Sequence, residues 1–349
     1  MLQKKNISFL FFLMVLCIFG PLVSGQAADK VVVIPLFGHG KPLKNIVTVA
    51  KAGGKFTDPV AAVNSITDAS STNPYLVVIA PGVYTLTHTL IMKPWVDVMG
   101  SGENVTKLTG GISDSVMWNS AIVYLQNDTV LSNLTIENVG GNKYSIGVFS
   151  EGGSSLKPAK IWKVSVDSTG GIYNSSIMVY FSSAIITDVN ASCQGGLTNE
   201  AISILHSSAI INRVYASASG NSSQRNSGVV SGYSNTELND VRVSADDGIE
   251  NDGLYNYYTT VQMTQVQAIG KGGTKNYGMS NIMGGCYLNI RRSTVIGETY
   301  GVYDSNPDSG KTFFSQSTIS GGTRVTGSGI LSCVACDDGR GNALDGSCQ

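Results

Sequence analysis

The most acidic stretch of this 349-residue chain is 246–253, where four carboxylates fall within seven residues: Asp246, Asp247, Glu250 and Asp252. Clustered carboxylate and amide oxygens are ligands that Ca²⁺ prefers, so a calcium site is one interpretation. A pair such as Asp246 and Asp247 also suits general acid and base chemistry, in which one carboxyl protonates a leaving oxygen and the other activates water. The third interpretation is a solvated turn, because Asp, Asn and Gly favour turns.

Aromatic residues follow this stretch directly. Tyr255, Tyr257 and Tyr258 lie within four residues, and further tyrosines recur at 277, 287, 300 and 303. An aromatic ring with a polar tip offers both an apolar plane and a hydrogen-bonding group, which suits the apolar faces and hydroxyl groups of sugars. We therefore predict that Tyr255, Tyr257 and Tyr258 bind polysaccharide, with packing in the core or in turns as the alternative.

An internal repeat indicates how these residues are positioned. The segments SSAIITDVNAS (182–192) and SSAIINRVYAS (207–217) share most of their residues at an offset of 25. Looser copies recur so that consecutive units are 24 to 30 residues apart, centred on Leu134, Val164, Val189, Val214, Val241, Val266, Ser293 and Ser317. Repeats of this length are typical of solenoids, in which each unit buries its apolar face against its neighbours.

Each unit contains short runs of alternating apolar and polar residues, separated by Gly, Ser, Asn or Asp. Such runs indicate strands, and the separating residues indicate turns. A propeller blade requires about 40–45 residues, whereas three short strands and three turns fit the observed unit. We predict an all-β, single-stranded parallel β-helix of about ten coils over residues 47–331, with strands about 4.8 Å apart. A β-sandwich is the alternative.

Both ends of a solenoid must be covered, because the end coils expose apolar side chains and strand edges. At the N-terminal end we predict a short helix over 58–66 with Asp58 as N-cap. Val60, Val63 and Ile66 are spaced to share its buried face.

Three cysteines lie in the last 17 residues: Cys333, Cys336 and Cys348. A hairpin turning at 340–341 places Cys333 opposite Cys348, so we predict a disulfide between them and a C-terminal hairpin cap over 332–349. A Cys336–Cys348 pair is the alternative. A metal site is disfavoured because the chain has neither a second Cys-x-x-Cys motif nor a nearby histidine.

Residues 1–27 have the features of a secretory signal: Lys4 and Lys5, an apolar stretch over 7–18, and small residues before Ala28. The apolar run is shorter than the ~20 residues of a spanning helix, although an uncleaved anchor is the alternative. We therefore predict a secreted protein, extracellular or at the cell surface, with the periplasm also open. We predict that residues 28–46 form an extended arm, and that its 29–44 portion could pair with a second copy.

The composition excludes several classes. Net charge is −1, from 23 Lys and Arg against 24 Asp and Glu, and no basic run is present, so we expect no nucleic-acid partner. Charged residues make up 13 % of the chain and hydrophobic residues 42 %, which argues against disorder. After signal cleavage we expect no membrane partner, since no other stretch is long and apolar enough to span a bilayer.

The first coils carry a family pattern. VAKAGGKFT (49–57), IAPGVY (79–84), GSG (100–102) and LSNLTIENVGG (131–141) resemble the N-terminal coils of the pectinesterases. The resemblance implies a right-handed parallel β-helix that hydrolyses pectin methyl esters with a nucleophilic Asp, an acid/base Asp, an Arg and oxyanion-stabilising Gln residues. Two other pectin-degrading classes are relevant to 246–253: polygalacturonases carry a similar Asp-Asp step, and pectate lyases use calcium on this fold.

The catalytic pattern of the pectinesterases is not matched here. Ser145 falls where that family has its first Gln, 168–171 (Ser-Thr-Gly-Gly) has neither Gln nor Asp, and Glu200 stands in place of the nucleophile. Ester hydrolysis requires the nucleophile, its acid/base partner and oxyanion donors together. We therefore predict a secreted protein that binds pectin-like polysaccharide without family-type catalysis and without an obligatory cofactor. The alternative is a divergent pectin esterase or uronate lyase, with Glu200, Asp246 and Asp247 as catalytic candidates and calcium as a possible cofactor.

Overall fold

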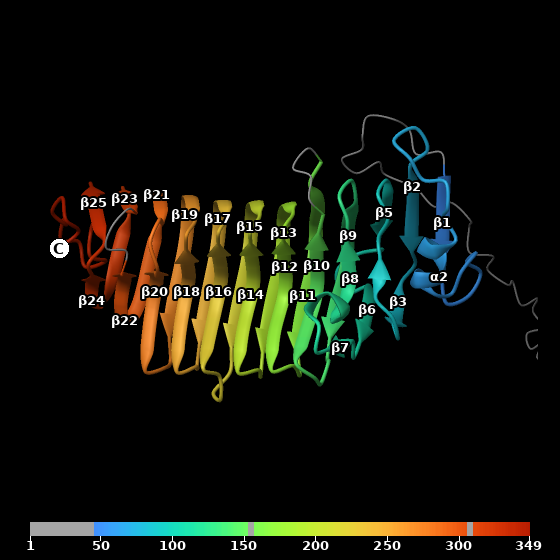
Figure 1. The fold of residues 1–349 in the computed structure, drawn as a ribbon, viewed down its shortest axis with the longest axis horizontal. Coiled ribbons are helices and arrows are strands. Elements are labelled where there is room, and N and C mark those ends of the chain that lie inside the picture. The colour runs from blue at the N-terminus through green and yellow to red at the C-terminus, as the bar shows by residue number, and fades with distance from the viewer. Residues whose placement is uncertain (1–44, 153–156, 306–309) are drawn as a thin grey trace, which may run out of the picture. The chain divides into compact units, whose positions relative to one another are not determined.

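Parallel strands stacked along one axis make up almost the whole structure (Figure 1). This computed structural model describes residues 45–152, 157–305 and 310–349. The predicted signal (1–27) and the 29–44 portion of the arm lie outside the described residues. The described part winds through about ten turns, so the predicted parallel β-helix is confirmed. Between the strands of the described residues, pairing is parallel apart from a two-residue contact of Ser113–Asp114 with Tyr144–Ser145, and isolated antiparallel bridges occur outside the strands.

The strands, in chain order, are β1 (Asn45–Val49), β2 (Tyr75–Ile79), β3 (Gly82–Thr85), β4 (Leu90–Ile91), β5 (Val96–Met99), β6 (Thr106–Gly110), β7 (Ser113–Asp114), β8 (Ala121–Leu125), β9 (Val130–Asn138), β10 (Tyr144–Glu151), β11 (Ala159–Thr169), β12 (Tyr173–Tyr180), β13 (Ser183–Gln194), β14 (Thr198–Leu205), β15 (Ser208–Ser219), β16 (Arg225–Gly232), β17 (Asn235–Asp246), β18 (Glu250–Tyr257), β19 (Thr260–Lys271), β20 (Lys275–Asn281), β21 (Tyr287–Arg291), β22 (Thr294–Asp304), β23 (Lys311–Ser315), β24 (Thr318–Gly327) and β25 (Ile330–Val334). The helices are α2 (Pro59–Asn64) and the 3₁₀ turn η1 (Met117–Asn119).

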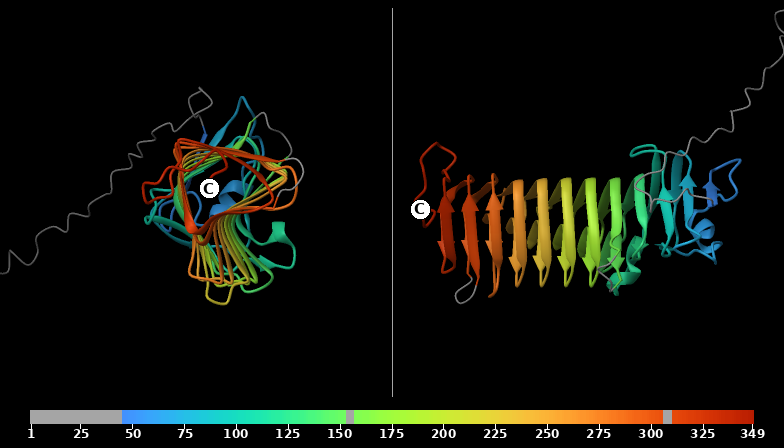
Figure 2. Two further views of the ribbon diagram at one scale, coloured as in Figure 1. Left: turned by 90° about the vertical axis from the view of Figure 1, so that its left-hand side faces the viewer. Right: turned by 90° about the horizontal axis from the view of Figure 1, so that it is seen from above.

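The central coils each consist of one short strand and one long strand. The short strands β10, β12, β14, β16, β18 and β20 stack on one another, and so do the long strands β11, β13, β15, β17 and β19. Figure 2 shows successive coils superimposed when viewed end-on. The repeat predicted from the sequence matches the register in which the coils stack. Val189 pairs with Val214, Val214 with Val241, and Val241 with Val266.

The long strands bend at one residue in the left-handed backbone region. Asp188, Arg213, Asp240 and Gln265 occupy this position in successive coils, with φ between 51° and 56°. Non-glycine residues rarely adopt this conformation, and Asp and Asn tolerate it best. The bend divides each long strand into two segments, which provides the second and third sides of the coil.

The interior holds columns of aliphatic side chains, one residue from each coil. Ile161, Ile186, Ile211, Leu238 and Met263 pair in register and are almost completely buried. Each side chain therefore packs against an aliphatic counterpart in the neighbouring coil. This burial is the main source of stability, since apolar area removed from water contributes roughly 25 cal/mol per Å².

A polar column also runs through the interior, where Asn174, Asn199, Asn226, Asn251 and Asn276 form a ladder. Each side-chain amide donates to the Oδ1 of the next, over 2.9, 2.8, 3.2 and 2.8 Å. Four of the five, all except Asn226, also accept a hydrogen bond from the turn that precedes their strand, as in the Gly196 N–H to Asn199 Oδ1 bond of 3.0 Å. Buried amides are tolerated here because they are hydrogen-bonded.

The N-terminal cap has the predicted helix and N-cap, although the helix spans Pro59–Asn64 rather than 58–66. Asp58 precedes α2, and its carboxylate accepts a 2.9 Å hydrogen bond from the Val60 N–H. Val63 and Ile66 are buried as expected, Val60 packs against the core at partial exposure, and Ala62 is also buried. The helix contacts β1, β2 and β4, so its apolar face covers the first coils. No helix in the described ranges is long and apolar enough to cross a bilayer.

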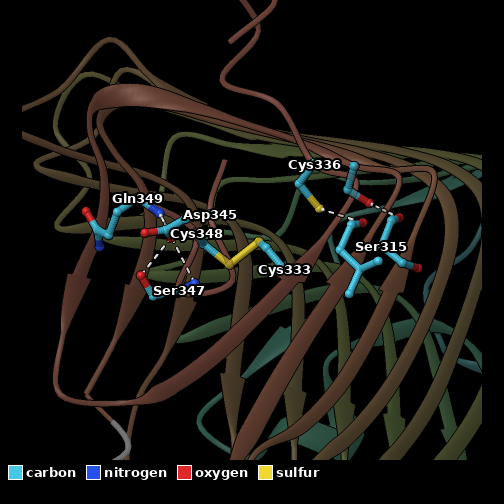
Figure 3. The surroundings of a disulfide bond; sticks show 9 residues. Ser315, Cys333, Cys336, Asp345, Ser347, Cys348 and Gln349 are labelled. Carbon is cyan, nitrogen blue, oxygen red and sulfur yellow. Dashed lines mark hydrogen bonds between the residues drawn. A yellow bond between two sulfur atoms is a disulfide. The ribbon is translucent and has the colours of Figure 1, made fainter. Parts of the chain in front are cut away.

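The C-terminal cap contains the predicted disulfide between Cys333 and Cys348, whose Cα atoms are 5.3 Å apart (Figure 3). Cys336, the alternative partner, is free and buried. An antiparallel bridge between Asp337 and Ala343 encloses the predicted turn at 340–341. The disulfide thereby fastens the last residues of the chain across the end coil.

Candidate functional site

The stacked short strands bring outward-facing residues of successive coils side by side. Glu200 on β14 pairs with Ser227 on β16, and Ser227 pairs with Asp252 on β18. Strands in a sheet lie about 4.8 Å apart, so Glu200 and Asp252 stand on one face about two strand spacings from each other. These carboxylates are 52 residues apart in the sequence, and only the solenoid register brings them together.

A cavity of about 360 Å³ opens on this face. Its volume is in the range of small-molecule binding sites. One buried carboxyl, one guanidinium and several tyrosine rings converge on it. Its lining residues are Tyr173, Glu200, Leu205, Arg225, Val230, Tyr233, Tyr255, Tyr257 and Met283.

Glu200 is 8 % exposed and is the carboxyl at the cavity. The hydroxyls of Tyr173 and Ser203 both donate to its Oε2. Within the part of the chain that the structure describes, Oε1 has no hydrogen bond, so it remains for a ligand. Burial raises the pKa of Glu200, and the two hydroxyls and the charge of Arg225 offset part of that increase.

Arg225 lies across the middle of the face. Its guanidinium is 4.3 Å from the centre of the Tyr255 ring, a cation–π distance. Its Nη2 is 3.7 Å from Glu250 Oε1, and its Nε is 3.9 Å from Asp252 Oδ2. The positive charge is therefore shared between two carboxyl groups of the same neighbouring strand.

Asp252 is completely buried beside Arg225. Ser280 donates a 2.6 Å hydrogen bond to its Oδ1. Burial raises the pKa of Asp252 to about 7; the Ser280 hydroxyl and Arg225 lower it, and Glu250 raises it. Three buried polar atoms of this group have no hydrogen-bond partner among the described residues: Arg225 Nε, Ser227 Oγ and Asp252 Oδ2.

Tyr257 occupies its place because residue 232 in the preceding coil is glycine. A Cβ atom at Gly232 would lie 2.1 Å from Tyr257 Cζ, so any other residue would displace the ring. The ring of Tyr257 meets those of Tyr233 and Tyr255 edge-on, at centroid distances of 5.6 and 5.8 Å. Together these tyrosines form an aromatic wall of the cavity.

An exposed aromatic stack borders the cavity at the turn that follows each short strand. Its members are Phe181, His206, Tyr233 and Tyr258, with ring centroids 4.7, 4.8 and 4.9 Å apart and interplanar angles of 4°, 4° and 15°. All four have φ between 44° and 50°. Their faces cover one another, so the stack presents ring edges and hydroxyl groups to solvent.

The structure gathers some of the predicted site residues and separates others. Glu200, Tyr255 and Tyr257 line one cavity. Tyr258 belongs instead to the stack, because it lies one residue beyond β18, where the chain turns. Arg225 and the stack were not predicted from the sequence, although the 25- to 27-residue offsets between 181, 206, 233 and 258 match the repeat.

The four carboxylates of 246–253 are not gathered into a calcium site. Asp246 ends β17 and pairs with Lys271 Nζ at 2.9 Å, and Asp247 is in the following turn with φ 63°. Glu250 and Asp252 belong to β18 and face Arg225, whose charge opposes a second cation. Among the described residues no group of three or more His, Cys, Asp or Glu is arranged to hold a metal ion.

Solved structures provide the comparison. Pectin methylesterase from carrot aligns at a TM-score of 0.50 and 14 % identity, covering 84 % of this chain and 89 % of that one. The full-length tailspike protein 2 from Escherichia coli O157:H7 bacteriophage CAB120 aligns at 0.56 and 10 % identity, covering 83 % of this chain and 42 % of that one. The chain has a pectin methylesterase-like parallel β-helix fold. No family model and no curated protein matches the sequence. At these identities the likeness is one of fold, and function must be argued from the site.

Proposed function

We propose that this chain binds a polysaccharide, outside the cell or at its surface, on the face formed by β12, β14, β16 and β18. The observation that carries the proposal is the cavity in which Glu200, Arg225 and the tyrosines of three coils converge. In this cavity Glu200 Oε1 can accept a hydrogen bond from a ligand, and the Arg225 guanidinium and the tyrosine hydroxyls can donate hydrogen bonds to it. The aromatic wall provides the apolar surface. This combination suits a sugar, whose hydroxyls and apolar ring faces require both kinds of contact.

The solenoid suits a polymer rather than a single sugar. Coils repeat about every 4.8 Å, so neighbouring coils present similar groups along the rod. The aromatic stack from Phe181 to Tyr258 continues the cavity wall over four coils. A glycan chain lying parallel to the rod would contact the cavity with one sugar and the stack edges with the next ones.

Export is part of the proposal. It is supported by the signal features of residues 1–27 and by the disulfide between Cys333 and Cys348, because disulfides persist in oxidising compartments.

The test is binding to a panel of soluble polysaccharides by affinity electrophoresis, followed by calorimetry on the polymers that bind. Tyr257→Ala removes part of the cavity wall and should weaken binding at least about tenfold, as loss of a buried aromatic anchor does. Tyr215→Ala is the matched control, since Tyr215 is 47 % exposed on β15, outside the cavity. Equal affinity of both variants and the unaltered protein would contradict the proposal.

A second function, glycan cleavage, is favoured by one observation. Glu200 is a buried carboxyl with a raised pKa at a cavity, beside an arginine, and perturbed carboxyls in clefts mark catalytic sites. The chemistry would be that of a divergent pectin esterase or uronate lyase. Methanol release from methylated pectin and unsaturated-product absorbance from polygalacturonate would detect it. Turnover that is lost in Glu200→Gln would establish catalysis over binding alone.

A further inference from the structure

The charged residues on the proposed binding face indicate which class of polysaccharide it can bind. On the short strands β12, β14, β16, β18 and β20 the charged residues are three acids and two bases. The acids are Glu200, Glu250 and Asp252, and the bases are Arg225 and Lys275. Acidic residues therefore outnumber basic ones on this face, and the two charges balance when Asp252 holds a proton.

Among the described residues that line the cavity, Arg225 is the one cation, and two carboxyl groups already lie within 4 Å of it. Arg225 lies 3.7 Å from Glu250 and 3.9 Å from Asp252 and rests on the Tyr255 ring. A ligand carboxylate could bind this guanidinium only by competing with two protein carboxyls. Lys275, the second base, lies opposite Glu250 in the register of the neighbouring strand and does not line the cavity.

The groups that remain for a ligand suit hydroxyls. Glu200 Oε1 can accept a hydrogen bond from a sugar hydroxyl, whereas it would repel a sugar carboxylate. The hydroxyl of Tyr257 is a neutral donor and acceptor at the same cavity. The described lining of the cavity therefore offers more groups to a hydroxyl than to a negative charge on the polymer.

We infer that the face selects uncharged polysaccharides and rejects polyuronates. The inference rests on the proposed binding function and names the chemical class of its ligand. It differs from the pectin-like, acidic ligand that the sequence resemblance suggests.

The test uses one polymer in two charge states. Polygalacturonate and its carboxyl-reduced form have the same backbone and linkage, and only the first is charged. They are titrated into the protein at two salt concentrations, beside an uncharged glucan and an uncharged galactan. We expect at least one uncharged polymer to bind with an affinity that salt leaves unchanged, and polygalacturonate to bind at least about tenfold more weakly.

A charge variant makes the test specific to this face. Glu250→Gln removes one partner of Arg225 and should raise the affinity for polygalacturonate severalfold, in a salt-sensitive manner. Glu237→Gln is the control with the same change in net charge, because Glu237 is exposed on β17, outside the cavity.

The outcomes separate the two claims. Polygalacturonate binding as tightly as its reduced form would overturn the inference and leave polysaccharide binding in place. Binding to none of these polymers or of the wider panel would contradict the proposed function and the inference with it.

Discussion

Asp252→Asn is the substitution whose effect the structure specifies in most detail. The carboxyl of Asp252 is completely buried, and burial raises its pKa from 3.8 to about 7. Between about pH 4 and pH 7 the folded protein therefore holds a proton that the unfolded chain has already released. Each pKa unit corresponds to about 1.4 kcal/mol, so this group lowers the free energy of unfolding by about 4 kcal/mol across that range.

The direction in which stability changes with pH follows from the number of protons that each state binds. Where the folded state binds more protons than the unfolded state, stability falls as pH rises, and the fall ends once the folded carboxyl has ionised above about pH 7. Asparagine does not ionise, and its Oδ1 can accept the same hydrogen bond that Ser280 donates to Asp252. The variant should therefore lose less stability than the unaltered protein as pH rises.

The assay is urea unfolding followed by tyrosine fluorescence and circular dichroism at pH 4.5, 6 and 8. The stability of Asp252→Asn relative to the unaltered protein should increase by about 3 kcal/mol from pH 4.5 to pH 8, because the unfolded carboxyl is already mostly ionised at pH 4.5. Effects of the amide that do not depend on pH cancel in this comparison. A stability difference that stays constant with pH would refute the reasoning.

Three further predictions concern other parts of the molecule. Gly232→Ala should displace the Tyr257 ring and weaken polysaccharide binding in calorimetry, while the circular-dichroism spectrum stays that of a β-protein. Joint replacement of Cys333 and Cys348 by serine should lower the free energy of unfolding by about 3 kcal/mol in urea titrations, because the bridge closes a 15-residue separation. Asp58→Ala should cost about 1 kcal/mol by the same measurement, since it removes the N-cap bond to α2, and Asp58→Asn should restore most of it.

The fold could be predicted because the buried residues recur with the period of the coils. Val189 and Val214 recur at a fixed offset since each must point into the same interior column. The Cys333–Cys348 pair and the Asp58 cap were predictable for a similar reason, because both depend on residues close together in the chain. Local spacing and hydrophobic period carry this information directly.

The site was only partly predictable, because it depends on which side of a strand each residue faces. Asp246 and Asp252 are six residues apart, yet one ends β17 beside Lys271 and the other lies buried on β18. A turn between them sends their side chains to different surroundings. Arg225 carries no local signal at all, since its role arises from Glu250 and Asp252 in the next coil.

The aromatic stack was missed for a different physical reason. Its members adopt positive φ, which favours glycine or asparagine in an isolated turn. Phe181, His206 and Tyr233 hold it because each ring packs on the ring of the next coil. This stabilisation exists only once the coils have stacked.

The central claim is that the cavity beside Glu200 and Tyr257 holds a sugar, and a crystal structure with an oligosaccharide of a polymer that binds tests it most directly. The account predicts a sugar ring against the aromatic wall, with a hydroxyl donating to Glu200 Oε1 and the chain continuing along the rod. An oligosaccharide bound instead on the long strands, for example over Ile185 and Ile210, would contradict it.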